Sequence, residues 1–150
     1  YEGMEELNER QAMEEAVNEA GKKQIDRPLL LAVTVLTSLQ DTDLKKMHIQ
    51  VSPLEQVCTL ASLAQEAGMD GIVCSPREIT AVREAVGPAF KIVTPGIRPS
   101  WAAAQDQKRI MTPAEALRLG SDYLVIGRPV IRAPSPENAL GRIIEELESV

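Results

Sequence analysis

The hydrophobic residues of the chain follow two patterns. Over residues 4 to 24, apolar side chains recur every three or four positions among Glu, Asn, Gln and Lys, which predicts an amphipathic helix that Gly21 is placed to end. Four short apolar runs, rich in β-branched residues, predict strands buried on both faces at residues 29 to 36, 71 to 74, 91 to 94 and 123 to 126. Helical periodicity occurs between and after these runs, at 53 to 67, 76 to 86, 112 to 119 and 136 to 148.

The boundaries of the four later helices carry local signals. A hydroxyl residue followed by proline offers an N-cap and a first helical position, and this pair occurs at Ser52, Ser75, Thr112 and Ser135. Glycine stands where three of these helices should stop, at positions 68, 87 and 120.

Strands that alternate with helices in this way predict an α/β fold with a parallel sheet and right-handed crossovers. The pattern fits an open doubly wound sheet or part of a (βα)8 barrel, and both architectures place ligands at the carboxyl ends of the strands. No long linker or change of composition interrupts the chain, so we expect a single domain over residues 1–150.

The composition and charge of the chain limit the kinds of partner that we expect it to bind. The 150 residues are 44% hydrophobic and 25% charged, as in an ordinary globular protein, and the formal net charge of −6 argues against a nucleic-acid partner. With no apolar run of about 18 residues and no signal-peptide pattern, we expect a cytoplasmic protein without a membrane partner. Cys58 and Cys74 lack metal-ligand spacing and are expected to be small buried residues, and no metal or cofactor is implied.

Three loops after predicted strands contain candidate binding residues. Pro95 and Arg98 follow the third strand and lead to Gln107, and Gly127 with Arg128 follows the fourth. A guanidinium suits phosphate, an amide can bond phosphate or a base edge, and glycine permits close approach of a ligand. These residues would otherwise form a solvated loop. Thr37 ends the first strand, where its hydroxyl could bond a heterocycle or simply cap a turn.

Four strings of the sequence resemble bacterial orotidine 5′-phosphate decarboxylase: LLLAVTVLTSL at 29 to 39, EAGMDGIVCSP at 66 to 76, KIVTPGIRP at 91 to 99 and DQKRIMTPAEALRLGSDYLVIGRPV at 106 to 130. The resemblance covers nearly everything from residue 28 onward. It implies a TIM barrel of the (βα)8 class, represented here by its last four βα units, strands 5 to 8, preceded by one helix.

The resemblance also implies the ligand and the role of each candidate residue. The ligand would be orotidine monophosphate (OMP) or its product UMP, in pyrimidine biosynthesis. Thr37 would lie near the pyrimidine and Pro95 would pack against the ring. The phosphate end would be formed by Arg98, Gln107, Gly127 and Arg128. The loop between Arg98 and Gln107, which contains Trp101, departs from the family's glycine-containing pattern.

In the resembling family, an Asp-x-Lys-x-x-Asp motif after strand three and a lysine from strand two surround the scissile carboxylate, and a lysine protonates the carbon as CO2 leaves. The stretch from Asp43 begins like this motif but ends in His48, and it follows the first predicted strand. We therefore expect no catalytic residue in this chain, a surface position for His48, and an inactive chain when it is alone.

Two alternatives remain. One is a non-catalytic nucleotide- or phosphate-binding half-barrel module, and the other is a pentulose-phosphate decarboxylase or epimerase, against which the strings near Thr37 and Arg98 argue. A half barrel would expose two unpaired strand edges and its apolar interior. We therefore expect either a fragment of a longer enzyme or a pair of such halves, with a homodimer as the assembly.

Overall fold

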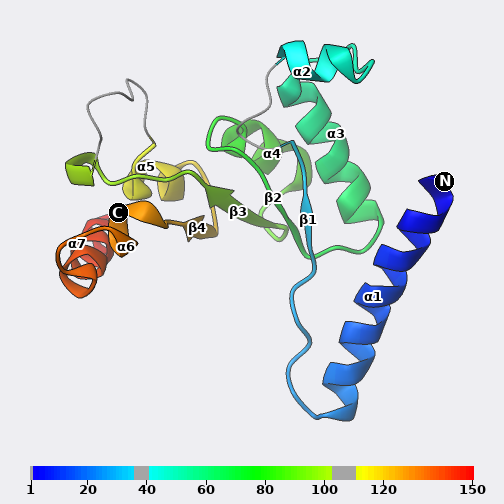
Figure 1. The fold of residues 1–150 in the computed structure, drawn as a ribbon, viewed down its shortest axis with the longest axis horizontal. Coiled ribbons are helices and arrows are strands. Elements are labelled where there is room, and N and C mark those ends of the chain that lie inside the picture. The colour runs from blue at the N-terminus through cyan, green and yellow to red at the C-terminus, as the bar shows by residue number, and fades with distance from the viewer. Residues whose placement is uncertain (1, 36–40, 103–110) are drawn as a thin grey trace. The chain divides into compact units, whose positions relative to one another are not determined.

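The computed structural model describes residues 2–35, 41–102 and 111–150, with side chains from residue 11 onward. The chain forms two compact units, residues 1–30 and 31–150. Whether these fold as the single domain expected from the sequence stays a prediction. The first unit contains α1 (Glu2–Lys22) (Figure 1), which confirms a helix in the predicted region, whereas its predicted amphipathic character stays a prediction. The helix continues through Gly21, and Gln24 closes the following turn with a φ of +54°.

The second unit is built on a parallel four-stranded sheet in the order β1-β2-β3-β4. The strands are β1 (Leu31–Val33), β2 (Gly71–Val73), β3 (Lys91–Pro95) and β4 (Tyr123–Val125). All four predicted strands are present, although β1 is much shorter than the apolar run that predicts it. Each strand lies beside its successor in the chain, as repeated right-handed βα units require, which confirms the α/β class.

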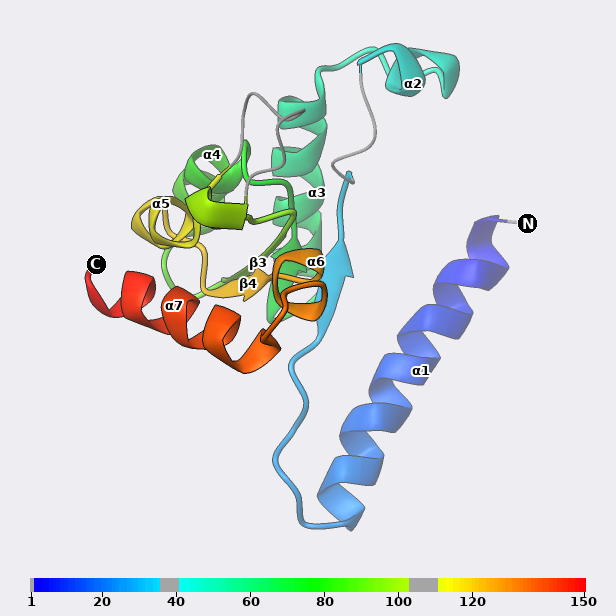
Figure 2. The same cartoon turned by 60° about the vertical axis from the view of Figure 1, so that its left-hand side comes forward.

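Seven further helical segments belong to this unit (Figures 1 and 2). They are α2 (Asp41–Lys46), α3 (Pro53–Glu66), α4 (Ile79–Val86), the 3-10 turn η1 (Ser100–Ala102), α5 (Pro113–Arg118), α6 (Arg128–Ile131) and α7 (Pro136–Glu148). The sequence pattern did not predict α6. Within the described ranges, none of the helices has the length and apolar character needed to cross a membrane.

Three of the four predicted N-caps are confirmed. The hydroxyls of Ser52, Thr112 and Ser135 accept hydrogen bonds from the backbone amides of Glu55, Glu115 and Asn138. The cap predicted at Ser75 is wrong. Its hydroxyl instead accepts from the amide of Arg77 at 3.4 Å and its carbonyl from the amide of Glu78 at 3.1 Å, so a separate turn precedes α4.

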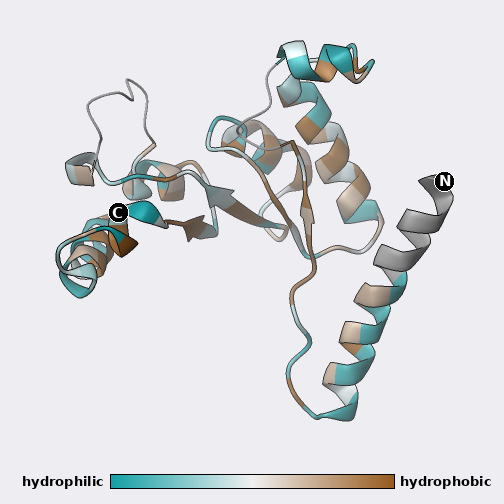
Figure 3. Cartoon of the chain, in the orientation of Figure 1, coloured by the Kyte–Doolittle hydropathy of each residue, from teal (hydrophilic) through white to brown (hydrophobic). Residues whose placement is uncertain are grey.

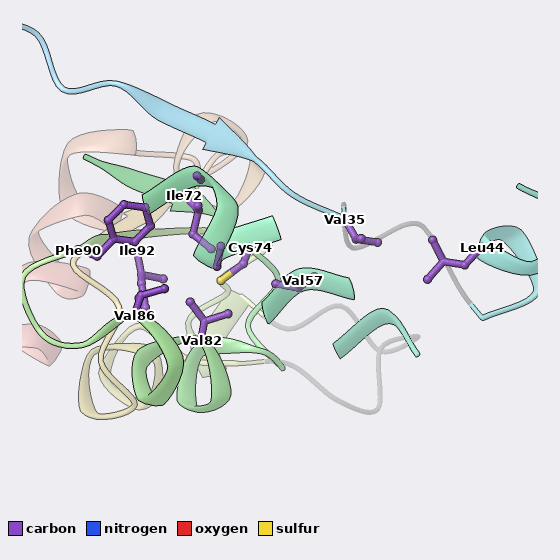
Figure 4. Packing of buried hydrophobic residues seen from close by; sticks show 11 residues of the cluster. Val35, Leu44, Val57, Ile72, Cys74, Val82, Val86, Phe90 and Ile92 are labelled. Atoms are coloured by element: carbon purple, nitrogen blue, oxygen red, sulfur yellow. The ribbon is translucent and has the colours of Figure 1, made fainter. Parts of the chain in front are cut away.

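Helices α3 and α4 cover one face of the sheet. Ile72 and Ile92 occupy paired positions on β2 and β3 and are fully buried. They pack with Val57 of α3 and with Val82 and Val86 of α4 (Figure 4). The predicted burial of Cys74 is confirmed, because it lies in the same cluster and is 1% exposed.

The opposite face of the sheet is apolar and partly open. Strands β1 and β4 carry the brown colour of hydrophobic residues in Figure 3. Val33 on β1 and Tyr123 and Val125 on β4 are 64%, 47% and 51% exposed. The prediction of two buried faces is therefore wrong for the outer strands. The physical reason is that β1 and β4 have a neighbour on one side only, and α3, α4 and α5 pack on the other face. Alternation in burial along a strand cannot be read from an uninterrupted apolar run.

Charged side chains connect the amino ends of β3 and β4. Arg83 of α4 donates to Oδ2 of Asp122 at 2.6 Å, and Lys91 approaches Oδ1 of the same carboxylate at 3.4 Å. The amide of Ile92 also donates to Asp122 at 2.8 Å. Burial acts to raise the pKa of Asp122, but the Ile92 amide and the two cations outweigh it, so the pKa lies below its ordinary value.

Candidate functional site

The loops that follow β3 and β4 leave the sheet side by side. Pro95, the last residue of β3, pairs in register with Val125, the last residue of β4. Parallel strands end at the same edge of a sheet, so the segments beginning at Gly96 and Ile126 start as neighbours. Gly96 has a φ of +80°, a conformation that glycine adopts without steric cost and that turns the chain away from the strand.

The loop after β3 is anchored by two buried residues. Ile97 is 1% exposed and Pro99 is fully buried, while the Arg98 side chain between them is half-buried. The backbone amide of Arg98 donates to the carbonyl of Met111 at 3.0 Å, which joins the two ends of the connection that leads to α5. The Arg98 guanidinium has no hydrogen bond or ion pair with another residue that the structure describes.

The loop after β4 turns directly into a short helix. Gly127 is the N-cap of α6, and its carbonyl accepts from the amides of Val130 and Ile131 at 3.0 and 3.1 Å. A Cβ built on Gly127 would meet nothing within 4 Å, so open space lies beside the backbone here. Arg128 is the first residue of α6 and its side chain is exposed. A ligand could therefore approach both the backbone of Gly127 and the guanidinium of Arg128.

A cavity of about 460 Å³ lies between η1, α6 and the start of α7. The described residues that line it are Trp101, Ala102, Arg128, Pro129, Arg132, Ala133, Pro134, Ser135, Asn138, Ala139 and Arg142. The Arg142 guanidinium lies over the indole ring of Trp101, 4.2 Å from its centroid. The cavity is therefore basic, with an aromatic wall.

The structure brings together part of the predicted site. Arg128 lines the cavity, while Pro95, Arg98 and Gly127 lie in the two neighbouring loops but do not line it. Thr37 and Gln107 lie outside the described residues.

Sequence reasoning missed three residues that line the cavity. They are Trp101, Arg132 and Arg142. The last two are ten positions apart and belong to no motif, so their convergence follows from the packing of α6 on α7. The one sequence feature that pointed to this cavity was Trp101, the single tryptophan of the sequence, in the loop after β3.

Two ionisable groups near the end of β2 are buried and belong to the core. Burial, together with the nearby Glu78 carboxylate, raises the pKa of the Cys74 thiol to about 12. Burial also raises the pKa of Glu78 itself, and its Oε2 has no hydrogen-bond partner among the residues that the structure describes. A thiol that stays protonated at neutral pH is a poor nucleophile, so Cys74 has a packing role. His48 is exposed, as predicted.

Comparison with known proteins finds similarity to orotidine 5′-phosphate decarboxylases. The model of the orotidine 5′-phosphate decarboxylase / HUMPS family matches residues 7–143. The orotidine 5′-phosphate decarboxylase of Haemophilus influenzae is 57% identical over 118 residues, which are 79% of this chain and 51% of that protein. The enzyme of Trichlorobacter lovleyi is 54% identical over 138 residues, covering 90% of this chain and 57% of that protein.

Solved structures of orotidine 5′-phosphate decarboxylases are also similar to this chain. The crystal structure of orotidine 5′-phosphate decarboxylase from Lactobacillus acidophilus is 39% identical, has a TM-score of 0.71, and is matched over 82% of this chain and 50% of that one. The structure from Pyrococcus horikoshii OT3, at 24% identity and a TM-score of 0.60, supports the fold alone.

The four βα units match half of the TIM barrel of these enzymes, and the chain spans about half the length of the curated relatives that it matches. The family model nevertheless extends over most of the residues, including both loops at the carboxyl edge of β3 and β4. The chain belongs to the orotidine 5′-phosphate decarboxylase / HUMPS family.

Proposed function

We propose that this chain is the phosphate- and pyrimidine-binding half of an orotidine 5′-phosphate decarboxylase, which converts OMP to UMP in pyrimidine biosynthesis. The nucleotide lies across the carboxyl edge of the sheet. Arg98, Gln107, Gly127 and Arg128 hold its phosphate, while Thr37 and Pro95 contact the pyrimidine. No metal or cofactor takes part.

The observation that carries this proposal is the pairing of Pro95 with Val125. It makes neighbours of two loops that each supply an arginine without an ion-pair partner among the described residues. Two guanidiniums and an uncovered glycine backbone offer charge-assisted hydrogen bonds to a phosphate dianion. In a TIM barrel, loops following the last two strands commonly bind phosphate.

We propose further that the chain alone does not decarboxylate OMP. The printed sequence has no Asp-x-Lys-x-x-Asp motif, and the nearest approach, from Asp43, has His48 where the second carboxylate would stand. The residues of Asp41–Lys46 form α2, away from the loops that follow β3 and β4 (Figure 1). Removal of CO2 needs charge arranged around the carboxylate, so binding without turnover is expected.

The apolar face formed by Val33, Tyr123 and Val125 supports an assembly in which this face is covered. In a complete barrel the same face would point to the packed interior. We propose a homodimer of the chain, located in the cytoplasm, when no other polypeptide completes the barrel. Sedimentation of the purified chain as a monomer at micromolar concentration would contradict the dimer.

Calorimetric titration with UMP and with uridine tests the binding site. Arg128→Ala should weaken the binding of UMP by about 2 kcal/mol, which is the size of a lost charge-assisted hydrogen bond. The binding of uridine should stay nearly unchanged. Arg118→Ala is the matched control, because Arg118 is an exposed arginine in the last turn of α5 and is not among the described residues that line the cavity. Equal losses for UMP and uridine would contradict a phosphate role for Arg128.

Turnover is tested separately by following the loss of OMP absorbance with the purified chain. We expect no decarboxylation, together with measurable UMP binding. Binding of a pentulose phosphate in preference to UMP would instead favour another phosphate-binding barrel. Decarboxylation that disappears in Arg128→Ala would contradict the proposed inactivity while supporting the proposed site.

A further inference from the structure

The cavity between η1, α6 and α7 contains more positive charge than one phosphate requires. Arg128, Arg132 and Arg142 all line it, and no Asp or Glu is among its described lining residues. None of the three guanidiniums has a carboxylate partner within salt-bridge distance among the described residues. The whole chain carries a net charge of −6, so this local excess of positive charge runs against its composition.

Helix stability favours Arg132 at one helix end and disfavours it at another. This residue is the C-cap of the four-residue helix α6, where a cation is favourable, but it also precedes α7. Arg132 lies three residues before Ser135, the N-cap of the 13-residue helix α7. The amino end of a helix carries partial positive charge, so a cation there is unfavourable unless an anion is also present. Mutual repulsion between like charges adds to this cost. An anion in the cavity would offset both effects.

The cavity also has the size and lining of a ligand site. Its volume of about 460 Å³ falls within the range of about 300–1,000 Å³ usual for small-molecule pockets. Arg142 is held against Trp101 by their stacking at 4.2 Å, which limits its conformations before a ligand arrives. Ser135 and Asn138 add neutral hydrogen-bonding groups at the same wall.

We propose that this cavity binds a diphosphate group, either as inorganic pyrophosphate or as the diphosphate of a nucleotide, with Arg132 and Arg142 as additional ligands beside Arg128. Two adjacent phosphates present enough oxygens to engage three planar guanidiniums, each of which can bind in a bidentate manner. The inference deepens the proposed function and rests on it in one respect, because Arg128 is also assigned to the nucleotide phosphate. Arg132 and Arg142 have no role in that assignment.

Trp101 is the only tryptophan of the chain, so its fluorescence reports on this cavity directly. Titration of the 150-residue chain with pyrophosphate should give a saturable change, at lower concentration than orthophosphate or sulfate. Arg132→Ala and Arg142→Ala should each weaken pyrophosphate binding about tenfold or more. Arg118→Ala should change it by less than about twofold, because that arginine is exposed and is not among the described lining residues.

Titration with UDP and UMP by calorimetry identifies the source of the diphosphate. UDP binding that exceeds UMP binding, and that falls to the UMP level in Arg142→Ala, would identify a nucleotide diphosphate. Pyrophosphate binding without a preference for UDP would identify the inorganic ion. Trp101→Phe, followed by calorimetry alone, checks that the optical signal measures binding.

The absence of saturable pyrophosphate binding by a chain with a folded circular dichroism spectrum would overturn the inference. Equal weakening by Arg118→Ala, or equal affinity for sulfate, would overturn it as well, since both indicate nonspecific charge attraction. The proposed nucleotide site would survive these results if UMP still binds and Arg128→Ala still weakens it. Conversely, pyrophosphate binding without UMP binding would refute only the proposed function.

Discussion

Replacing Arg83 by methionine should destabilise the second unit more than any other change to a single surface charge. The guanidinium donates five hydrogen bonds, to the carbonyls of Gly87, Phe90 and Gly120 and to Oδ2 of Asp122. These acceptors belong to the end of α4, the start of β3 and the turn before β4. Arg83 therefore joins the end of α4 and the start of β3 to the turn before β4, which lies 37 residues further along the chain. Methionine keeps its apolar stem while removing every donor.

The expected loss is about 3 kcal/mol in the free energy of unfolding. Single hydrogen bonds from a charged donor contribute about 1.5–3 kcal/mol, and five independent bonds would approach the whole stability of a domain, about 5–15 kcal/mol. They are not independent, because one rigid group makes them all. Arg83 and Asp122 are also 20% and 22% exposed at their side chains, so water partly replaces the lost partners.

Urea unfolding followed by circular dichroism measures this loss, with an unchanged m-value as evidence that both variants unfold from the same state. Lys91→Met is the matched control, because Lys91 meets the same carboxylate at 3.4 Å with a side chain that is 38% exposed. An exposed pair of this kind contributes at most about 1 kcal/mol. If Arg83→Met costs no more than Lys91→Met, the carbonyl bonds contribute little and the reasoning is wrong.

Four further substitutions test the packing and the titrating groups. Gly71→Ala should lower the free energy of unfolding, measured by thermal unfolding, by about 3 kcal/mol, because a Cβ would lie 2.3 Å from the carbonyl oxygen of Lys91. Gly141→Ala should stabilise the fold slightly, because Gly141 lies inside α7 and a Cβ there would meet nothing within 4 Å. The raised pKa of Glu78 means that folding favours its protonated form, so the native chain should lose stability relative to Glu78→Gln as pH rises from acid to neutral. The lowered pKa of Asp122 has the opposite sign: the advantage of the native chain over Asp122→Asn should be present above the ordinary aspartate pKa and disappear as pH falls through the folded value. Urea midpoints that do not change with pH for either carboxyl variant would contradict the assigned pKa shifts.

Local chemistry made much of the fold predictable. Apolar runs located all four strands, and the hydroxyl-proline pairs at Ser52, Thr112 and Ser135 located helix starts to within a residue. Glycine at positions 68, 87 and 120 has positive φ, as helix termination predicts. These features depend on interactions within a few residues, and such interactions are visible in sequence.

Features that depend on distant neighbours were not predictable in the same way. Ser75 has the sequence of a cap, yet its hydroxyl forms a turn, and α4 begins only at Ile79, which is fully buried against Ile97 and Ala116. The order of the strands decides which apolar runs are covered on both faces. Likewise, Arg142 meets Trp101 only because α7 packs beside η1, and nothing in either local sequence indicates that contact.

The two ends of the sheet have different tasks. The stabilising contacts of Arg83 and Asp122 lie at the amino ends of β3 and β4, while Arg98 and Arg128, which we propose as ligand-binding residues, follow the carboxyl ends. This separation lets the binding loops carry unpaired positive charge, because the strands beneath them are held by bonds at the other end. It follows that Arg83→Met should lower stability without changing the UMP affinity of the remaining folded chain, whereas Arg128→Ala should lower affinity without changing the urea midpoint. A variant at either end that altered both quantities together would show that the two ends are energetically coupled.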